Sequence, residues 1–98
     1  MPLDATSRPA VPVPQGVGCW MAVKKTEPAE FVWVVATRGA LNQLDPTALE
    51  DQHLAVFNKN RSDIESIASK KFDSEGPNPD DGEQEGRPVL MVRSSDLP

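Results

Sequence analysis

The chain has 98 residues, with 10 lysines and arginines, 15 acids, one histidine and one cysteine. This length allows one domain, and the single cysteine, Cys19, excludes an intrachain disulfide and a cysteine-based zinc cluster. The longest uninterrupted apolar run, residues 31–36, is too short to span a membrane, and no signal-peptide pattern opens the chain. We therefore expect a cytoplasmic protein with no membrane partner.

The formal charge of −5 is concentrated in one segment. Six acids and no base lie between residues 73 and 86, so the remainder holds 10 bases against nine acids (15 minus six). The bases are scattered and form no stripe of the kind that nucleic-acid binding requires. We therefore expect a flexible acidic loop at residues 73–86 and no nucleic-acid partner.

The first 18 residues are rich in proline and weakly patterned. Pro9, Pro12 and Pro14 lack a backbone N–H, so this segment can serve only as an extended edge or as an arm. We expect residues 1–18 to form a proline-rich N-terminal arm and residues 19–97 to form a single domain.

Two apolar runs, residues 19–23 and 31–36, predict the first pair of strands. The second run is β-branched and aromatic, and the polar residues between the runs end in Pro28 and indicate a hairpin loop. Trp20 and Trp33 are expected to be packing residues, paired across the hairpin or capping the two ends of the core. A solvent-facing stacking platform is the functional alternative. The 31–36 strand should be central because both of its sides are apolar.

A helical pattern follows these strands. Thr37 is expected to cap a short helical turn over residues 37–44, and the main helix is expected to begin between residues 46 and 51. From residue 54 to 72 the apolar side chains share one half of the helical wheel. Gly76, followed by proline, must end the helix. The apolar half consists of Leu54, Phe57, Ile64, Ile67, Ala68 and Phe72.

These elements predict an α+β fold, which is completed by a final strand at residues 88–93. We expect a small antiparallel sheet of three to four strands, with one long amphipathic helix packed on one face, in the order strand, strand, helix, strand. One helix covers only one face of such a sheet. The other face must therefore be covered by the N-terminal arm or by a second copy of the chain.

Three segments of the sequence resemble those of a known protein family. Ala40-Leu41 follows an apolar strand, the helix carries Phe-x-x-Asn-Arg-x-x-Ile-x-x-x-Ala from Phe57 to Ala68, and the last strand runs into Ser-Asp-Leu. Over residues 19–97 the chain resembles the bacterial domain-of-unknown-function family 1488. The resemblance supports the fold and implies no activity, cofactor or site residue, because the family carries none to transfer.

Three polar residues lie on or near the apolar half of the helix. By angle, His53 and Asn60 lie on that half and Arg61 lies near its edge. Polar groups that face a core must form hydrogen bonds. Asn60 is therefore expected to hold the backbone of a strand end or loop, and Arg61 to reach a carboxylate, with Asp96 as the attractive partner. The functional alternative is a small ligand-binding or enzymatic site under the helix, built from His53, Asn60, Arg61 and Asp96.

The residues present do not support other chemistry. A Cys19–His53 pair has no third orienting residue, and a cysteine among apolar neighbours is expected to be buried and unreactive. The acidic loop fails the calcium-loop pattern, since prolines occupy ligand positions before Gly82. Gly16 and Gly18 lack the third glycine of a dinucleotide-binding loop. We therefore expect no metal, no cofactor and no catalytic residue.

Two classes of function remain. We favour a non-enzymatic interaction or accessory module, which acts as a homodimer or with another protein through the uncovered sheet face or the acidic loop. This class is favoured because the strands carry more apolar surface than one helix hides. The second class is the small-ligand or enzymatic site described above.

Overall fold

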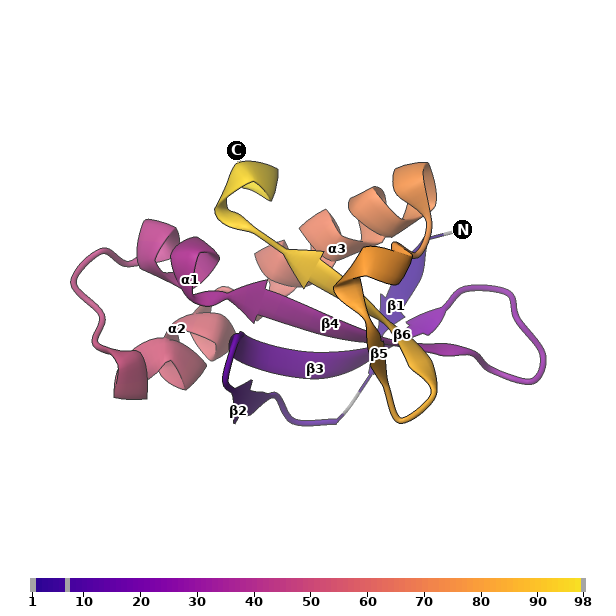
Figure 1. Ribbon diagram of the computed structural model, residues 1–98, viewed down its shortest axis with the longest axis horizontal. Helices are drawn as coiled ribbons and strands as arrows, with labels where there is room; N and C mark the ends of the chain where they lie inside the picture. Colours follow the sequence, from indigo (N-terminus) through magenta and orange to yellow (C-terminus); the bar gives the residue numbers. More distant parts are fainter. Residues whose placement is uncertain (1, 7, 98) are drawn as a thin grey trace.

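The computed structural model of the chain describes residues 2–6 and 8–97. This part of the chain combines a six-stranded sheet with three α-helices, which confirms the α+β class (Figure 1). None of the described helices is both long enough and apolar enough to cross a membrane. The strands are β1 (Leu3–Ala5), β2 (Val11–Val13), β3 (Gly16–Val23), β4 (Phe31–Thr37), β5 (Glu83–Gln84) and β6 (Arg87–Val92); the α-helices are α1 (Arg38–Leu44), α2 (His53–Lys59) and α3 (Arg61–Glu75); the short 3-10 helices are η1 (Glu50–Gln52), η2 (Pro79–Asp81) and η3 (Ser94–Asp96).

The sheet is mixed and has more strands than the sequence predicts. Its order is β1-β3-β4-β6-β5, and β2 pairs with a second stretch of β3. All pairs are antiparallel except β4 with β6, which are parallel. The expectation of a purely antiparallel sheet of three to four strands is therefore wrong. The chain passes through α1, α2 and α3 between β4 and β6, and such a crossover allows a strand to return in the same direction.

The proline-rich N-terminal segment supplies two of the extra strands. β1 pairs with residues 21–23 and β2 with residues 16–18, both at the edge of β3. An edge strand tolerates Pro12 because only one of its sides pairs with the sheet. Part of the predicted arm is thus an edge of the sheet, and residues 13–15 border the face that the helices leave uncovered.

β3 and β4 form the hairpin that the apolar runs predict, with β4 between β3 and β6. Trp20 lies directly opposite Trp33, and their ring centroids are 4.9 Å apart at an interplanar angle of 59°. Tilted geometry of this kind is favourable for aromatic pairs. Thr26 holds the connecting loop, since its hydroxyl donates to the Val23 carbonyl and accepts from the Glu30 N–H.

The predicted single long helix is wrong, because the helix breaks at Asn60. α2 ends there and α3 begins at the next residue. Asn60 has backbone angles φ −110° and ψ 13°, and its side-chain amide donates to the Val56 carbonyl at 2.9 Å. Asparagine competes with the helical backbone for such bonds and is therefore favoured at helix ends. The apolar stripe continues through the break, since Phe57, Ile64 and Phe72 are all buried.

The start of the helical region also differs from the prediction. Thr37 caps α1 as expected, with its hydroxyl accepting from the Ala40 N–H at 3.2 Å. At the beginning of the predicted start region, residues 45–47 form a local turn, in which the Asp45 carboxylate accepts from the backbone N–H and the hydroxyl of Thr47. The hydrogen bonds from Thr47 lower the pKa of the Asp45 carboxyl. The helix proper begins later, at His53 after η1.

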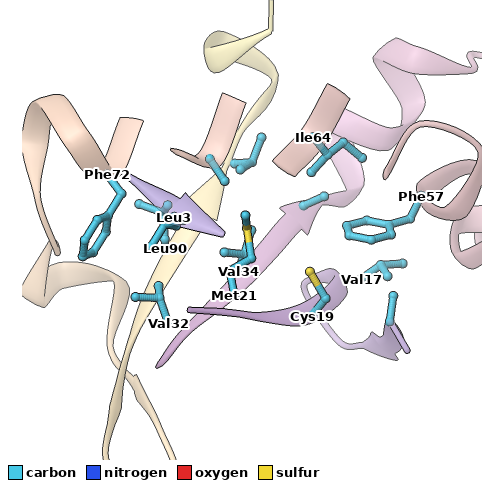
Figure 2. Close-up of a cluster of buried hydrophobic side chains, with 14 of the residues drawn as sticks. Leu3, Val17, Cys19, Met21, Val32, Val34, Phe57, Ile64, Phe72 and Leu90 are labelled. Carbon is cyan, nitrogen blue, oxygen red and sulfur yellow. The ribbon is translucent and has the colours of Figure 1, made fainter. Parts of the chain in front are cut away.

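The main core lies between the helices and one face of the sheet (Figure 2). Because side chains of a strand alternate between the two faces, this core receives every second residue of β3, β4 and β6. The helices contribute Phe57, Ile64 and Phe72, and β1 contributes Leu3. The strand residues of this core include Val17, Cys19, Met21, Val32, Val34 and Leu90.

The acidic segment at residues 73–86 contains more regular structure than its composition predicts. α3 extends into it and ends at Gly76, whose φ of 69° lies in the left-handed region that favours glycine. η2 and β5 follow before the chain turns into β6. The predicted flexibility of this segment stays a prediction.

Candidate functional site

A second apolar cluster lies on the face of the sheet that points away from α3. Three of its residues are buried and three are partly buried against them. In Figure 1, α3 lies behind the sheet and this second face is turned toward the viewer. The cluster, which we call the tryptophan face, consists of Val13, Trp20, Trp33, Val35, Val89 and Met91.

The tryptophan face is hollowed by a groove of about 410 Å³. Its floor includes Trp33, Val35 and Val89, and its walls are residues 13–15 on one side and residues 81–84 on the other. The second wall follows from the path of the chain, because η2 and β5 pass in front of the sheet (Figure 1). The face therefore combines an apolar floor with polar walls.

Gly18 makes the position of Trp33 possible. A methyl group added at Gly18 would overlap the Trp33 indole, so the ring lies directly over the backbone of β3. Sequence reasoning missed this role, because a glycine inside a strand does not reveal which side chain lies over it. The predicted packing of Trp20 against Trp33 is confirmed, and Gly18 leaves the space that the Trp33 ring occupies.

The outer edge of β6 is closed to further strands. Asp81, whose side chain is 2% exposed, accepts from the Met91 N–H at 3.3 Å and from the Arg93 guanidinium at 3.0 Å. The Val89 N–H donates to the Gly82 carbonyl at 3.2 Å. These bonds use the donors that an exposed edge strand would offer to another chain. Asp81 was not identified from the sequence because it lies within a run of acids that is typical of a solvated loop.

The opposite edge is fastened to α3. The Leu3 N–H donates to the Ser69 hydroxyl at 3.0 Å. Arg61 donates to the carbonyls of Thr6 and Arg8, at 3.5 and 2.8 Å. β1 and β2 have only three residues each, so this edge offers little backbone for strand addition. The tryptophan face is therefore the more accessible surface for a partner.

One end of the tryptophan face carries charges of both signs. A pocket of about 130 Å³ is lined there by Trp20, Phe31, Arg8, Glu85 and Arg87. The Arg8 guanidinium lies 5.5 Å from the centre of the Phe31 ring, within the range of a cation–π contact. In the described part of the chain, the side chains of Arg8, Glu85 and Arg87 form no hydrogen bond or ion pair.

Two of the four residues predicted for a ligand site hold helices in place. His53 is buried, and its Nε2 lies 3.0 Å from the Asn42 Oδ1, which joins α2 to α1. The side chain of Asn60 holds the Val56 carbonyl inside α2. It does not hold a strand end or loop as expected, because its amide donates to the Val56 carbonyl, which also accepts from the Asn60 backbone N–H.

The predicted pair of Arg61 with Asp96 is wrong. Arg61 Nε donates to Glu65 Oε2 at 3.3 Å, one helical turn away, so Arg61 does reach a carboxylate. Asp96 accepts from Lys71 Nζ and from the Arg93 N–H, both at 2.9 Å. Lys71 lies ten residues after Arg61, about 15 Å along the helix axis, which places Asp96 out of reach of Arg61. Burial raises the pKa of Asp96, but the hydrogen bonds from Lys71 and Arg93 outweigh it and lower that pKa overall.

The four predicted site residues thus have separate partners. Over residues 2–6 and 8–97, no hydrogen bond or ion pair joins any two of His53, Asn60, Arg61 and Asp96. His53 and Asp96 also line different cavities, of about 240 and 360 Å³. The ligand site stays a prediction, and the cavities at His53 and Asp96 are separate.

Cys19 is fully buried, as its apolar neighbours predict. Burial raises the pKa of its thiol to about 11, although the nearby Arg61 charge acts in the opposite direction. A thiol with this pKa is protonated at neutral pH and is a poor nucleophile. Within the described residues, no three His, Cys, Asp or Glu side chains are grouped in a way that could hold a metal ion.

Comparison with known proteins identifies a family and nothing more specific. A family model described as "Protein of unknown function (DUF1488)" matches residues 14–83. The match includes β3, β4 and the three α-helices, and it ends before β6, so the Ser-Asp-Leu segment at residues 95–97 lies outside it. No curated protein and no solved structure matches the chain.

Proposed function

The chain belongs to the DUF1488 family of proteins of unknown function, and from that premise we propose that it is a non-enzymatic interaction module. Its working surface is the tryptophan face, on which another polypeptide docks. The observation that carries this proposal is the asymmetry of the sheet. One face packs against α2 and α3, whereas the other presents an apolar cluster with a groove.

The composition of the tryptophan face supports this function. Trp, Met and Arg are enriched in protein interfaces, and Trp and Arg are the commonest residues at which truncation weakens binding. Here Trp20 and Met91 are partly exposed beside the buried Trp33, and Arg8 and Arg87 lie at the end of the same face. An apolar centre with a charged rim is the usual anatomy of an interface.

The edges of the sheet favour docking on the face over strand addition. Asp81 and Gly82 already accept from the β6 edge, and Arg61 and Ser69 hold the N-terminal edge. A partner that added a strand would have to displace these bonds first. A partner that packs on the tryptophan face displaces only water.

Position-specific photo-crosslinking tests this function in cells that express the protein. A photoreactive amino acid is placed at Met91, on the tryptophan face, and at Ser66, an exposed position on α3, as the matched control. We expect a discrete crosslinked polypeptide from position 91 and none from position 66. Equal crosslinking from the two positions, or none from position 91, would contradict the proposal.

A further inference from the structure

We propose that the partner on the tryptophan face is a second copy of this chain, in a two-fold symmetric homodimer in which Arg87 of each copy meets Glu85 of the other. The inference rests on the proposed function, since it names the occupant of the same face. It is carried by the pocket at the end of that face, where unpaired charges of both signs lie beside Trp20 and Phe31.

The three charged side chains of this pocket have no partner of opposite charge within the described part of the chain. Arg8, Glu85 and Arg87 are exposed, line one pocket, and form no ion pair in the described part of the chain. Two other charges near the face, Arg93 and Lys24, are already paired, with Asp81 and Asp4. The pocket is therefore a place where a partner can supply counter-charges without breaking an existing ion pair.

The acid and one of the bases in this pocket, Glu85 and Arg87, lie close together in the chain. Glu85 lies in the turn between β5 and β6, with φ 52°, and Arg87 begins β6 two residues later. In a two-fold symmetric interface the same patch meets itself, so residue i contacts j and j contacts i. A patch that holds an acid and a base near the axis is self-complementary, because each acid faces a base of the other copy.

A second copy of the chain fits this pocket better than a partner segment whose charges are all of one sign. A purely acidic segment would meet Glu85, and a purely basic one would meet Arg8 and Arg87, so each would suffer repulsion. A second copy pairs Arg87 with Glu85 twice, leaves each Arg8 over its own Phe31 ring, and buries the two tryptophan pairs against each other. The whole molecule extends 41 × 24 × 24 Å, so one of its broad sides is comparable to the roughly 800 Å² per partner that a stable interface buries.

Charge exchange within this pocket tests the dimer. Sedimentation equilibrium is measured for the wild type and for the variants Arg87→Glu, Glu85→Arg and the double exchange Glu85→Arg/Arg87→Glu. Each single variant creates two like-charge contacts across the axis, and we expect its dimer dissociation constant to rise about tenfold or more. The double exchange restores opposite charges, and its dissociation constant should return close to the wild-type value.

Lys70→Glu is the matched control, because it makes the same charge change on the exposed side of α3. It should leave the dissociation constant unchanged, and circular dichroism should show all variants folded. A wild type that stays monomeric at millimolar concentration would overturn the dimer, while crosslinking from position 91 to a different polypeptide would leave the proposed function standing. A dimer that all three variants form equally well would overturn the Arg87–Glu85 contact and with it the proposed geometry.

Discussion

At the scale of single residues, Lys71 holds together three elements of the fold. Its ammonium group donates to the Met91 carbonyl of β6 at 2.7 Å and to Asp96 of η3 at 2.9 Å. Both members of the Lys71–Asp96 pair are largely buried, with side chains 15% and 21% exposed. A pair with this burial contributes more than an ion pair in open solvent, and removing one partner leaves the other desolvated.

Replacing Lys71 by methionine tests this junction. The substitution keeps the aliphatic stem and removes the charge, so Asp96 and the Met91 carbonyl lose a donor. We expect the free energy of unfolding, measured by urea denaturation, to fall by about 1–3 kcal/mol. Lys70→Met, at the exposed neighbouring position, should change it by less than about 0.5 kcal/mol. If Lys71→Met and Lys70→Met lowered the free energy of unfolding equally, the proposed stabilising role of Lys71 would be contradicted.

The pH dependence of stability follows from the same carboxylate. The pKa of Asp96 is lower in the folded state than its ordinary value of 3.8. The carboxylate of Asp96 therefore binds a proton less readily in the folded state than in the unfolded state. Its contribution to the free energy of unfolding is fully present above the ordinary pKa. It is lost as the pH falls through the lowered pKa. Acid titration of stability should show a smaller loss below pH 4 for Asp96→Asn than for the wild type; parallel curves would contradict this.

Cys19 gives a prediction about reactivity. Because its thiol is fully buried and burial raises its pKa to about 11, a disulfide reagent at pH 8 should not modify the folded protein. Modification should follow the rate of unfolding and become rapid in denaturant. Stoichiometric labelling of the folded protein within seconds would show that Cys19 is accessible.

At the scale of elements, the packing of β3 against β4 depends on the missing side chain of Gly18, because the Trp33 ring occupies the space above it. An alanine there would push its methyl group into the Trp33 ring and disturb the tryptophan face. We expect Gly18→Ala to lower the melting temperature, at a cost of about 1–3 kcal/mol, and to change the tryptophan fluorescence. Gly39→Ala in α1 is the control, since nothing lies closer than 3.9 Å to the added methyl. A stable Gly18→Ala variant with unchanged fluorescence would contradict the contact.

Local patterns predicted most elements of this fold. Of the apolar half-wheel predicted from residue 54 to 72, four members are buried and two, Leu54 and Ile67, are partly buried; Thr37 predicted the start of α1. These features depend on neighbours within a few residues. The break at Asn60 was not predicted, because the motif that contains it is equally compatible with a continuous amphipathic helix, and only the bond to Val56 in the folded chain marks its end.

Pairings between distant segments were the part that sequence could not supply. The parallel alignment of β4 with β6 depends on the path of the intervening helices, and local sequence patterns do not determine that path. For the same reason the sequence placed Arg61 with Asp96, although their positions along α3 and η3 put them apart. The closed β6 edge was missed because Asp81 looked like one acid among six.

At the scale of the whole molecule, the sheet has two unlike faces. The first is sealed by the helices and contains Met21, which is 1% exposed. The second contains Met91, which is only partly buried and lies in the groove of the tryptophan face. The proposed docking of a partner depends on that difference, because a face that helices already cover leaves no surface on which a partner can dock.

Hydroxyl-radical footprinting of the two methionines measures this difference most directly, since both are the same residue type on opposite faces of the sheet. In dilute solution, where no partner covers the tryptophan face, we expect Met91 to be oxidised several-fold faster than Met21. As the protein concentration rises, the rate at Met91 should fall while Met21 stays protected. Equal oxidation rates for the two residues in the folded, dilute protein would contradict the account.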